Sequence, residues 1–242
     1  MMEMIHRASL AHEQRVGSQV VNAMAASTLE EKPVYELAGY YLKVATTWQE
    51  IKAAHQLRAK VYDTELQWSH ANNGMEADVF DQYACHYVVI APTGEVAATL
   101  RVLGWRDPWM AAECYDGRFV EEAILFQTPN TQEVSRLCIA QSHRDKKIAG
   151  RCSILDLVLE GLLAVGRRNH IRYSYFVTRA AMERVLMKRS FVVHHTSSVH
   201  KMPDGCRIKS FLVDNYDSHQ RVKLQSSTPR SIDRYSFTLS PC

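Results

Sequence analysis

Hydrophobic and polar positions along the chain switch repeatedly between the two-residue period of strands and the longer period of helices. The alternating segments predict strands at residues 40–46, 83–90, 96–104, 133–140, 171–178, 191–198 and 208–216. The segments with helical spacing predict helices at residues 47–63, 153–169 and 178–190, the first of them capped by Thr47. Residues 105–132 follow neither period and are expected to be irregular. This alternation predicts an α/β (α+β) chain with a mixed central sheet and helices on both faces.

The same pattern divides the chain into three parts. Residues 35–217 form the predicted folded domain. Residues 1–34 are weakly periodic and predict an N-terminal extension that is helical or flexible. Residues 218–242 are polar and predict a C-terminal tail that frays. Inside the domain, Asn-Asn-Gly at residues 72–74 is a turn signal.

Composition narrows the class of protein. The chain has 242 residues, 46% of them hydrophobic, which is enough for one sizeable core. The formal net charge of +3 does not indicate nucleic acid as a partner. No apolar run is long enough for a membrane span, and the first residues lack the apolar core of a signal peptide. Six scattered cysteines without CxxC or zinc-like spacing favour reduced thiols, so a cytoplasmic protein is expected.

Charged residues concentrate at two places. Glu76, Asp78 and Asp81 crowd against the start of a strand that reads as buried. Buried charges need partners of opposite sign, so these carboxylates are either a polar loop or one half of an ion-pair cluster. The turn after residues 133–140 is strongly basic. It is either a solvated loop or a binding surface for an acidic carrier protein with a phosphate-linked arm.

The order of elements resembles the GNAT acyltransferases over roughly residues 40–215. Enzymes of that fold carry Arg/Gln-x-x-Gly-x-Gly/Ala at the basic turn, and Arg144, Lys147 and Ala149 stand at those positions. The resemblance implies that backbone N–H groups and the dipole of the following helix hold phosphate groups of an acyl donor. Lys147 replaces the first glycine of this motif, which argues against tight binding of the pyrophosphate of coenzyme A.

Within that fold the sequence resembles the acyl-homoserine lactone (autoinducer) synthases and their relatives, the long-chain N-acyl amino acid synthases. The motifs in family order are Arg58, Tyr62 and Trp68 in RAKVYDTELQW; Glu76, Asp78, Phe80 and Asp81 in EADVFD; Arg101 in TLRVLG; a loosely aligned Phe119; and Glu133 and Arg136 in EVSR. Tyr62 stands where the family usually has Phe. The resemblance implies a buried polar cluster behind the amine-substrate site. In it Asp78 and Asp81 would be matched by arginines, and the whole motif set would shape or support the acceptor pocket.

The implied reaction moves a fatty acyl group from a thioester to a primary amine. Glu133 is the candidate base, directly or through one water, and Arg136 belongs to the same implied catalytic pair. The alternative is that Glu133 only pairs with Arg136. Backbone N–H groups near Leu137–Ile139 would hold the oxyanion if this strand has the bulge that GNAT enzymes typically have. Cys138 reads as a core thiol, and residues 153–163 and 173–178 are expected to line the acyl tunnel.

The resemblance implies a phosphopantetheine thioester on acyl carrier protein, or a coenzyme A thioester, as donor. No bound cofactor or metal is expected. The expected donor-binding residues are Leu137, Cys138, Ile139, Arg144, Lys147, Ala149 and Arg151.

The acceptor stays open between two amines. Arg58, Trp68 and Asp78 favour S-adenosylmethionine and a lactone product, whereas the N-terminal extension and the loop at residues 199–207 favour an amino acid and a plain amide. Two other functions compete with this reading. One is an ordinary GNAT acetyltransferase that uses acetyl-CoA on a small amine or lysine, and the other is a non-catalytic carrier-binding module.

Overall fold

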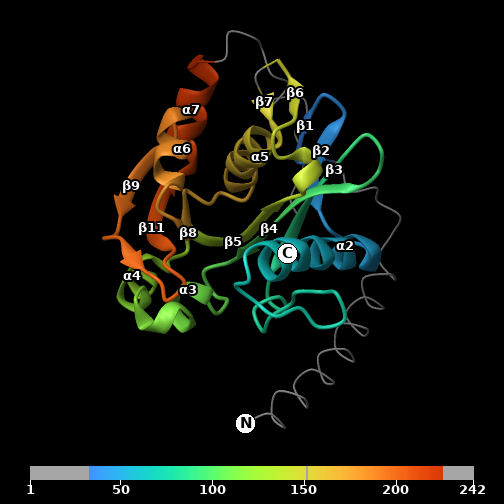
Figure 1. The fold of residues 1–242 in the computed structure, drawn as a ribbon. Helices are drawn as coiled ribbons and strands as arrows, with labels where there is room; N and C mark the ends of the chain where they lie inside the picture. Colours follow the sequence, from blue (N-terminus) through green and yellow to red (C-terminus); the bar gives the residue numbers. More distant parts are fainter. Residues whose placement is uncertain (1–32, 151, 226–242) are drawn as a thin grey trace.

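The computed structural model describes residues 33–150 and 152–225 (Figure 1). The predicted N-terminal extension up to residue 32, Arg151 and the end of the predicted tail at 226–242 lie outside the described residues.

A nine-stranded sheet has the order β1-β2-β3-β4-β5-β8-β11-β10, and β9 pairs with β11 outside that path. The strands are β1 (Tyr35–Leu37), β2 (Tyr40–Val44), β3 (Cys85–Ile90), β4 (Val96–Leu103), β5 (Thr131–Ile139), β8 (Tyr173–Arg179), β9 (Val192–Thr196), β10 (His200–Lys201) and β11 (Arg207–Asp214). β5 and β8 pair in parallel, and the other paired strands of this sheet are antiparallel. The predicted mixed sheet is therefore confirmed.

Helices cover both faces of the sheet, as predicted (Figure 1). The helices are α2 (Trp48–Arg58), α3 (Met110–Glu113), α4 (Val120–Phe126), α5 (Ile154–Arg168), α6 (Met182–Lys188) and α7 (Asn215–Gln225). α5 and α6 pack on the face that carries Phe176 and Phe211, and α7 packs beside α5. α2, α3 and α4 cover the opposite face, where the neighbouring residues Tyr175 and Leu212 point. No helix in the described part of the chain is long and apolar enough to cross a membrane.

Side-chain caps start α2 and α5. The Thr47 hydroxyl accepts the N–H of Glu50, and the Glu50 carboxylate accepts the N–H of Thr47, so the predicted cap is confirmed as a capping box. Ser153 and Asp156 form the same arrangement at the start of α5. Both boxes satisfy N–H groups that the first helical turn leaves without an intrahelical acceptor.

Three predictions about local structure were wrong. Residues 105–132 contain α3 and α4 rather than an irregular segment. The predicted tail begins too early, because residues up to 225 form α7, in which Ser218 is fully buried and accepts the N–H of Val192 at 2.8 Å. The basic turn does not run directly into a helix, because β6 (Lys147–Ala149) and β7 (Cys152–Ser153) form a short hairpin there.

Candidate active site

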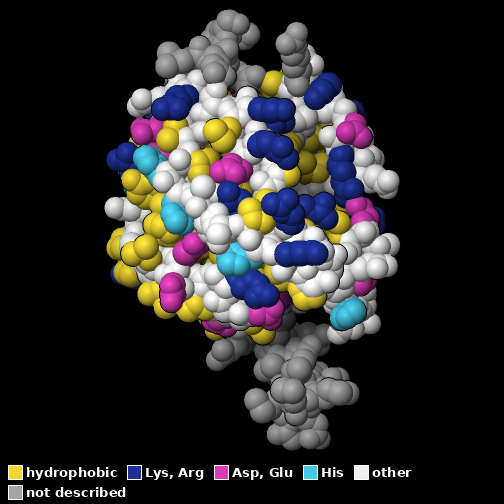
Figure 2. All heavy atoms as spheres, turned by 60° about the vertical axis from the view of Figure 1, so that its left-hand side comes forward, with side chains coloured by type: hydrophobic (Ala, Val, Ile, Leu, Met, Phe, Trp, Pro, Cys, Tyr) yellow, Lys and Arg dark blue, Asp and Glu magenta, His cyan; other side chains and the backbone are white. Residues whose placement is uncertain are grey.

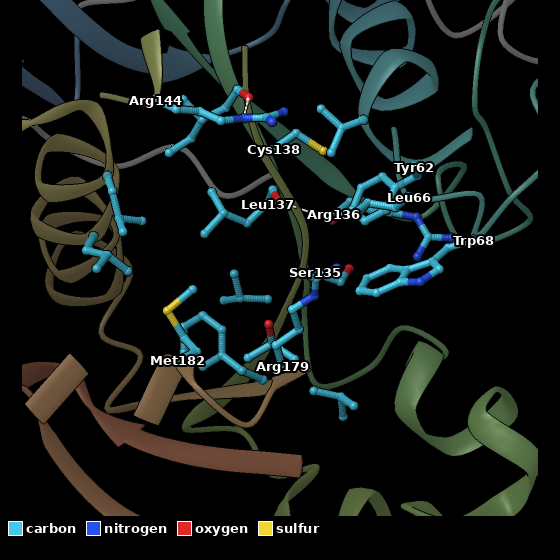
Figure 3. Close-up of a pocket in the computed structure, with 18 of the residues that line it drawn as sticks. Tyr62, Leu66, Trp68, Ser135, Arg136, Leu137, Cys138, Arg144, Arg179 and Met182 are labelled. Carbon is cyan, nitrogen blue, oxygen red and sulfur yellow. Dashed lines mark hydrogen bonds between the residues drawn. The ribbon is translucent and has the colours of Figure 1, made fainter. Parts of the chain in front are cut away.

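A cavity lies where β5 and β8 separate. The parallel register runs from Thr131–Tyr173 to Val134–Phe176 and then ends, although both strands continue. The divergence opens a cavity of about 340 Å³ (Figure 3). Its lining includes Leu155, Leu159, Phe176, Met182 and Leu186 from the α5 and α6 face, and Val61, Tyr62, Leu66 and Trp68 from the α2 face. The cavity therefore passes through the sheet and joins its two faces.

β5 bulges beside this opening. Ser135 lies opposite Arg101, and Cys138 lies opposite Thr99. Between these two pairs β5 advances by three residues and β4 by only two, so β5 carries one extra residue. Arg136, inside the bulge, has a φ of 53°, which is uncommon for a residue with a side chain. The bulge predicted from the resemblance is confirmed.

A cluster of three arginines and three carboxylates lies behind the cavity. The charge cluster consists of Arg58, Glu76, Asp78, Asp81, Arg101 and Arg136. Two guanidinium nitrogens of Arg58 donate to the two carboxylate oxygens of Asp81, at 2.7 and 3.0 Å. Arg101 donates to Asp78 and, at 2.9 Å, to Asp81, while Arg136 donates to Asp78 at 2.8 Å. The prediction that arginines match Asp78 and Asp81 is confirmed, and the formal charges of the cluster cancel.

Local structure brings the cluster together. Arg58 ends α2, and the chain continues as the π-helix η1 (Ala59–Glu65), a form often found at functional sites. The loop then reverses at Asn73 and Gly74, whose φ angles of 50° and 73° suit a tight turn, so the predicted turn is confirmed. Asp81 accepts the backbone N–H of Asp78 at 2.8 Å, which holds the returning loop in place.

The cluster shifts the pKa values of its members and neighbours. Burial acts to raise the pKa of Asp81, but Arg58 and Arg101 outweigh it and hold that pKa well below its usual range. Burial, helped by the Arg58 charge, lowers the pKa of His55 to about 4. His86 is shifted in the same direction, again chiefly by burial. Both imidazoles are neutral at pH 7 and add no charge to a cluster that is already balanced.

A row of two stacked aromatic rings with a guanidinium group at each end forms one wall of the cavity. The Arg136 guanidinium lies 5.4 Å from the ring centre of Tyr62. The rings of Tyr62 and Trp68 stack with centres 6.3 Å apart, and the Arg179 guanidinium lies 4.7 Å from the Trp68 ring. This stacked row of Arg136, Tyr62, Trp68 and Arg179 runs from β5 to the end of β8 (Figure 3). The Tyr62 hydroxyl donates to the Leu137 carbonyl at 3.1 Å, inside the bulge region.

Glu133 lies deeper in the protein. Its two carboxylate oxygens accept the N–H groups of Met110 and Ala111, both at 2.8 Å, so it caps α3. Burial raises its pKa to about 7, although these N–H groups oppose the shift. The structure shows no ion pair between Glu133 and Arg136 in the described part of the chain; Arg136 binds Glu76 and Asp78 instead.

The cavity brings together part of the predicted site. It is lined by Tyr62, Trp68, Arg136, Leu137, Cys138, Ile139 and Arg144, and by parts of residues 153–163 and 173–178, as expected. Lys147 and Ala149 lie in β6, outside the lining. Phe119, expected at the acceptor pocket, does not line the cavity. It is fully buried among Trp109, Met110 and other core residues, away from the cavity lining.

Sequence reasoning missed Arg179 and Met182. Both follow a predicted strand, but their part in the cavity depends on where β8 leaves β5, which no local pattern records. Cys138 lines the cavity as a thiol rather than a thiolate, because burial raises its pKa to about 12. Its burial agrees with the prediction of a core thiol.

Two groups of side chains have metal-ligand spacing in the described part of the chain: His55, Asp81 and His86, and His194, Asp214 and Asp217. The first group is unsuited to a cation because Asp81 already binds Arg58 and Arg101, whose charges repel one. The second joins the exposed His194 to the buried Asp214, which already binds Arg172 at 2.9 Å. Neither group fits a resident metal ion.

Comparison with known proteins shows consistent similarities. An acyl-homoserine-lactone synthase of Pseudomonas amygdali pv. tabaci is 24% identical over 194 residues, which cover 78% of this chain and 81% of that protein. MesI, a CoA-dependent acyl-homoserine lactone synthase, has a TM-score of 0.62 and 17% identity over 76% of this chain and 93% of its own. FeeM, an N-acyl amino acid synthase from uncultured soil microbes, has a TM-score of 0.55 and 10% identity, covering 82% of this chain and 98% of its own.

At these identities the two solved structures establish the fold, which is GNAT-like. Membership of a family rests on a match in sequence to a model of that family. A model of the autoinducer synthase family matches residues 43–209, more than half of the chain, and the protein therefore belongs to that family of acyltransferases.

Proposed function

We propose that the protein transfers a fatty acyl group from a thioester to the amine of S-adenosylmethionine and releases an N-acyl-homoserine lactone. The observation that carries this proposal is the cavity through the sheet, which joins an apolar arm to a polar, aromatic wall. Leu155, Leu159 and Phe176 suit an acyl chain. The stacked row suits a polar acceptor with a charged amino-acid portion. The thioester carbonyl would lie between them, at the bulge of β5.

The open edge of β5 suits the acyl carbonyl. From Ser135 onward the structure shows no pairing between β5 and β8 in the described chain, so the backbone groups on that edge face the cavity. N–H groups aimed at a developing oxyanion stabilise the tetrahedral intermediate of acyl transfer. Residues 137–139 are the candidates here. The Tyr62 hydroxyl, bound to the Leu137 carbonyl, helps to hold this segment in place.

Glu133 is our candidate for the group that takes the proton of the amine. A pKa of about 7 is well matched to general base catalysis near neutral pH. Glu133 lies two residues before Ser135 on β5, and side chains at that spacing share a face of a strand. Ser135 lines the cavity, so the alternation of the strand supports a Glu133 side chain that points to the same face. A water molecule between the amine and the carboxylate would complete the path.

We propose acyl carrier protein as the donor, so that the reaction takes place in the cytoplasm. Arg144, Lys146 and Lys147 are exposed, and Arg144 also lines the cavity. Figure 2 shows further Lys and Arg side chains gathered on the face turned toward the viewer. The N-terminus of α5 is poorly suited to binding a pyrophosphate, because the Asp156 carboxylate already places a negative charge there. A carrier protein, in contrast, would bind through its acidic surface.

A plain N-acyl amino acid is the second candidate product. The similarity to FeeM, which spans 98% of that chain, favours it. Both products require the same acyl cavity and the same amide bond. They differ in whether the carboxylate then attacks the carbon bonded to the sulfonium sulfur, which closes a lactone ring and releases the sulfur as a neutral thioether.

The proposal can be tested by expressing the chain in a bacterium that makes no such lipids and analysing culture extracts by mass spectrometry. We expect a series of acyl-homoserine lactones, and none from the Arg136→Ala variant. N-acyl amino acids in their place would support the second candidate product and contradict the lactone. Soluble protein without either product, together with turnover of acetyl-CoA by the purified enzyme, would contradict the proposal. Purified acyl carrier and coenzyme A thioesters of one chain length, compared by kcat/KM, then identify the donor.

A further inference from the structure

Three guanidinium groups line the cavity, and two of them have acidic partners. Arg136 binds Glu76 and Asp78, and Arg144 binds Glu65 at 2.6 Å. Arg179 has no acidic partner among residues 33–150 and 152–225. It therefore presents a positive charge to the cavity that no carboxylate of the described chain neutralises.

The packing of Arg179 leaves its hydrogen-bond donors available. The guanidinium lies over the Trp68 ring, with its central carbon 4.7 Å from the ring centre. Such a contact uses the flat face of the group, whereas the N–H donors point outward along its edge. An arginine held on an aromatic ring is thereby oriented to bind a carboxylate through two parallel hydrogen bonds.

The position of Arg179 indicates which substrate it meets. Figure 3 shows Arg179 and Arg144 at opposite ends of the cavity lining. Arg144 lies next to Lys146 and Lys147, where the phosphate groups of a donor would arrive. Arg179 ends the stacked row that begins at Arg136, on the side of the cavity assigned to the acceptor.

We propose that Arg179 binds the α-carboxylate of the acyl acceptor and so selects acceptors that carry one. This inference rests on the proposed function and extends it to a residue outside the motif set. The carboxylate belongs to either acceptor, S-adenosylmethionine or a free amino acid, because both share the α-amino acid group. The bound carboxylate would hold the acceptor in the cavity.

The test compares acceptors with and without the carboxylate. The full chain and its Arg179→Met variant are assayed with S-adenosylmethionine and its decarboxylated analogue, and with tyrosine and tyramine. Loss of a charge-assisted pair corresponds to about 10- to 100-fold, so Arg179→Met should raise KM for the carboxylate-bearing acceptor by that factor. The kcat and the KM for the donor should stay near the wild-type values. With the decarboxylated acceptor, wild type and variant should have equal KM, and Arg179→Lys should retain part of the effect. Arg184→Met, an exposed arginine on α6, is the matched control.

An unchanged KM for the carboxylate-bearing acceptor in Arg179→Met would overturn the inference, and so would a rise in KM for the donor alone. Titration calorimetry with S-adenosylmethionine and with tyrosine separates this result from failure of the proposed function. Wild-type protein that binds an acceptor more tightly than Arg179→Met, yet forms no amide, would contradict the proposed function and support the role of Arg179. Equal affinity, or no binding by either protein, would contradict the role of Arg179.

Discussion

Arg58 and Asp81 form a two-pronged ion pair, with nitrogen–oxygen distances of 2.7 and 3.0 Å, and both side chains are buried. The pair joins the end of α2 to the loop that carries the carboxylates. Arg101 shares the same carboxylate at 2.9 Å. Neither charge is stable in the interior alone, so the pair makes the packing of the acceptor wall depend on a complete set of partners.

Removing the Asp81 charge should therefore destabilise the fold strongly. Asp81→Asn leaves two buried guanidinium groups short of a partner, and we expect the free energy of unfolding to fall by about 3–5 kcal/mol. Urea denaturation measures the loss. Asp145→Asn, an exposed carboxylate in the basic turn, should change stability by less than about 0.5 kcal/mol. Equal effects of the two variants would contradict a structural role for the cluster.

Mild acid should weaken the fold through His55. Burial lowers its pKa to about 4 in the folded protein, whereas an unfolded chain has a histidine pKa near 6.5. A depressed histidine pKa means that the unfolded state takes up the proton first. Its contribution to stability is therefore complete above about pH 6.5 and declines as the pH falls toward 4, by about 3 kcal/mol in total.

The measurement is urea unfolding of wild type and His55→Gln at several values between pH 7 and pH 4.5. The variant should show a shallower decline with falling pH than the wild type. His70→Gln, a substitution in the loop after η1, should follow the wild-type curve. Parallel curves for wild type and His55→Gln would show that the imidazole is not held neutral.

The proton-accepting role of Glu133 predicts a pH profile. A base with a pKa of about 7 must be ionised to act, so kcat/KM should rise with pH up to about 7 and then level off. Glu133→Gln should lower kcat by about 10²- to 10⁴-fold and remove that limb. Because Glu133 also caps α3, the melting temperature of the Glu133→Gln variant must be measured in parallel with its activity. Glu113→Gln, on the exposed side of α3, should keep both rate and profile. An unchanged acidic limb in Glu133→Gln would assign the base elsewhere.

The apolar arm of the cavity should limit the acyl chain. Leu155 lines it and is only partly buried, so a larger side chain can enter the space without displacing the core. We expect Leu155→Phe to lower kcat/KM for long acyl donors by about 10-fold or more and to leave short donors nearly unchanged, because a lost apolar contact of a few methylenes has this effect. Leu125→Phe, an exposed position on α4, is the control. A uniform loss across all chain lengths would place the acyl chain elsewhere.

Much of the fold was accessible from the sequence because it follows from local rules. The Thr47 cap depends on residues three apart, and the Asn73–Gly74 turn depends on positive φ angles that those residue types tolerate. The pairing of Asp78 and Asp81 with arginines was implied by the resemblance to the autoinducer synthases, and it gives buried charges the partners that they need. The wrong predictions also have a cause in the limits of local patterns. Ser218 looked like part of a polar tail because a hydroxyl that accepts a backbone N–H in the interior leaves no hydrophobic signal.

The sequence by itself determined the order of the main strands and helices, the motif set and its charge balance, because period, capping and ion pairing are properties of short segments or of residue types. Only the tertiary structure decided where β5 and β8 part, and with that which side chains share the cavity. It also decided that Phe119 packs in the core, that Glu133 caps α3, and that Arg179 stacks on Trp68 from a strand more than 100 residues away. These relationships depend on the register of strands that are distant in sequence, and no pattern within either strand specifies that register.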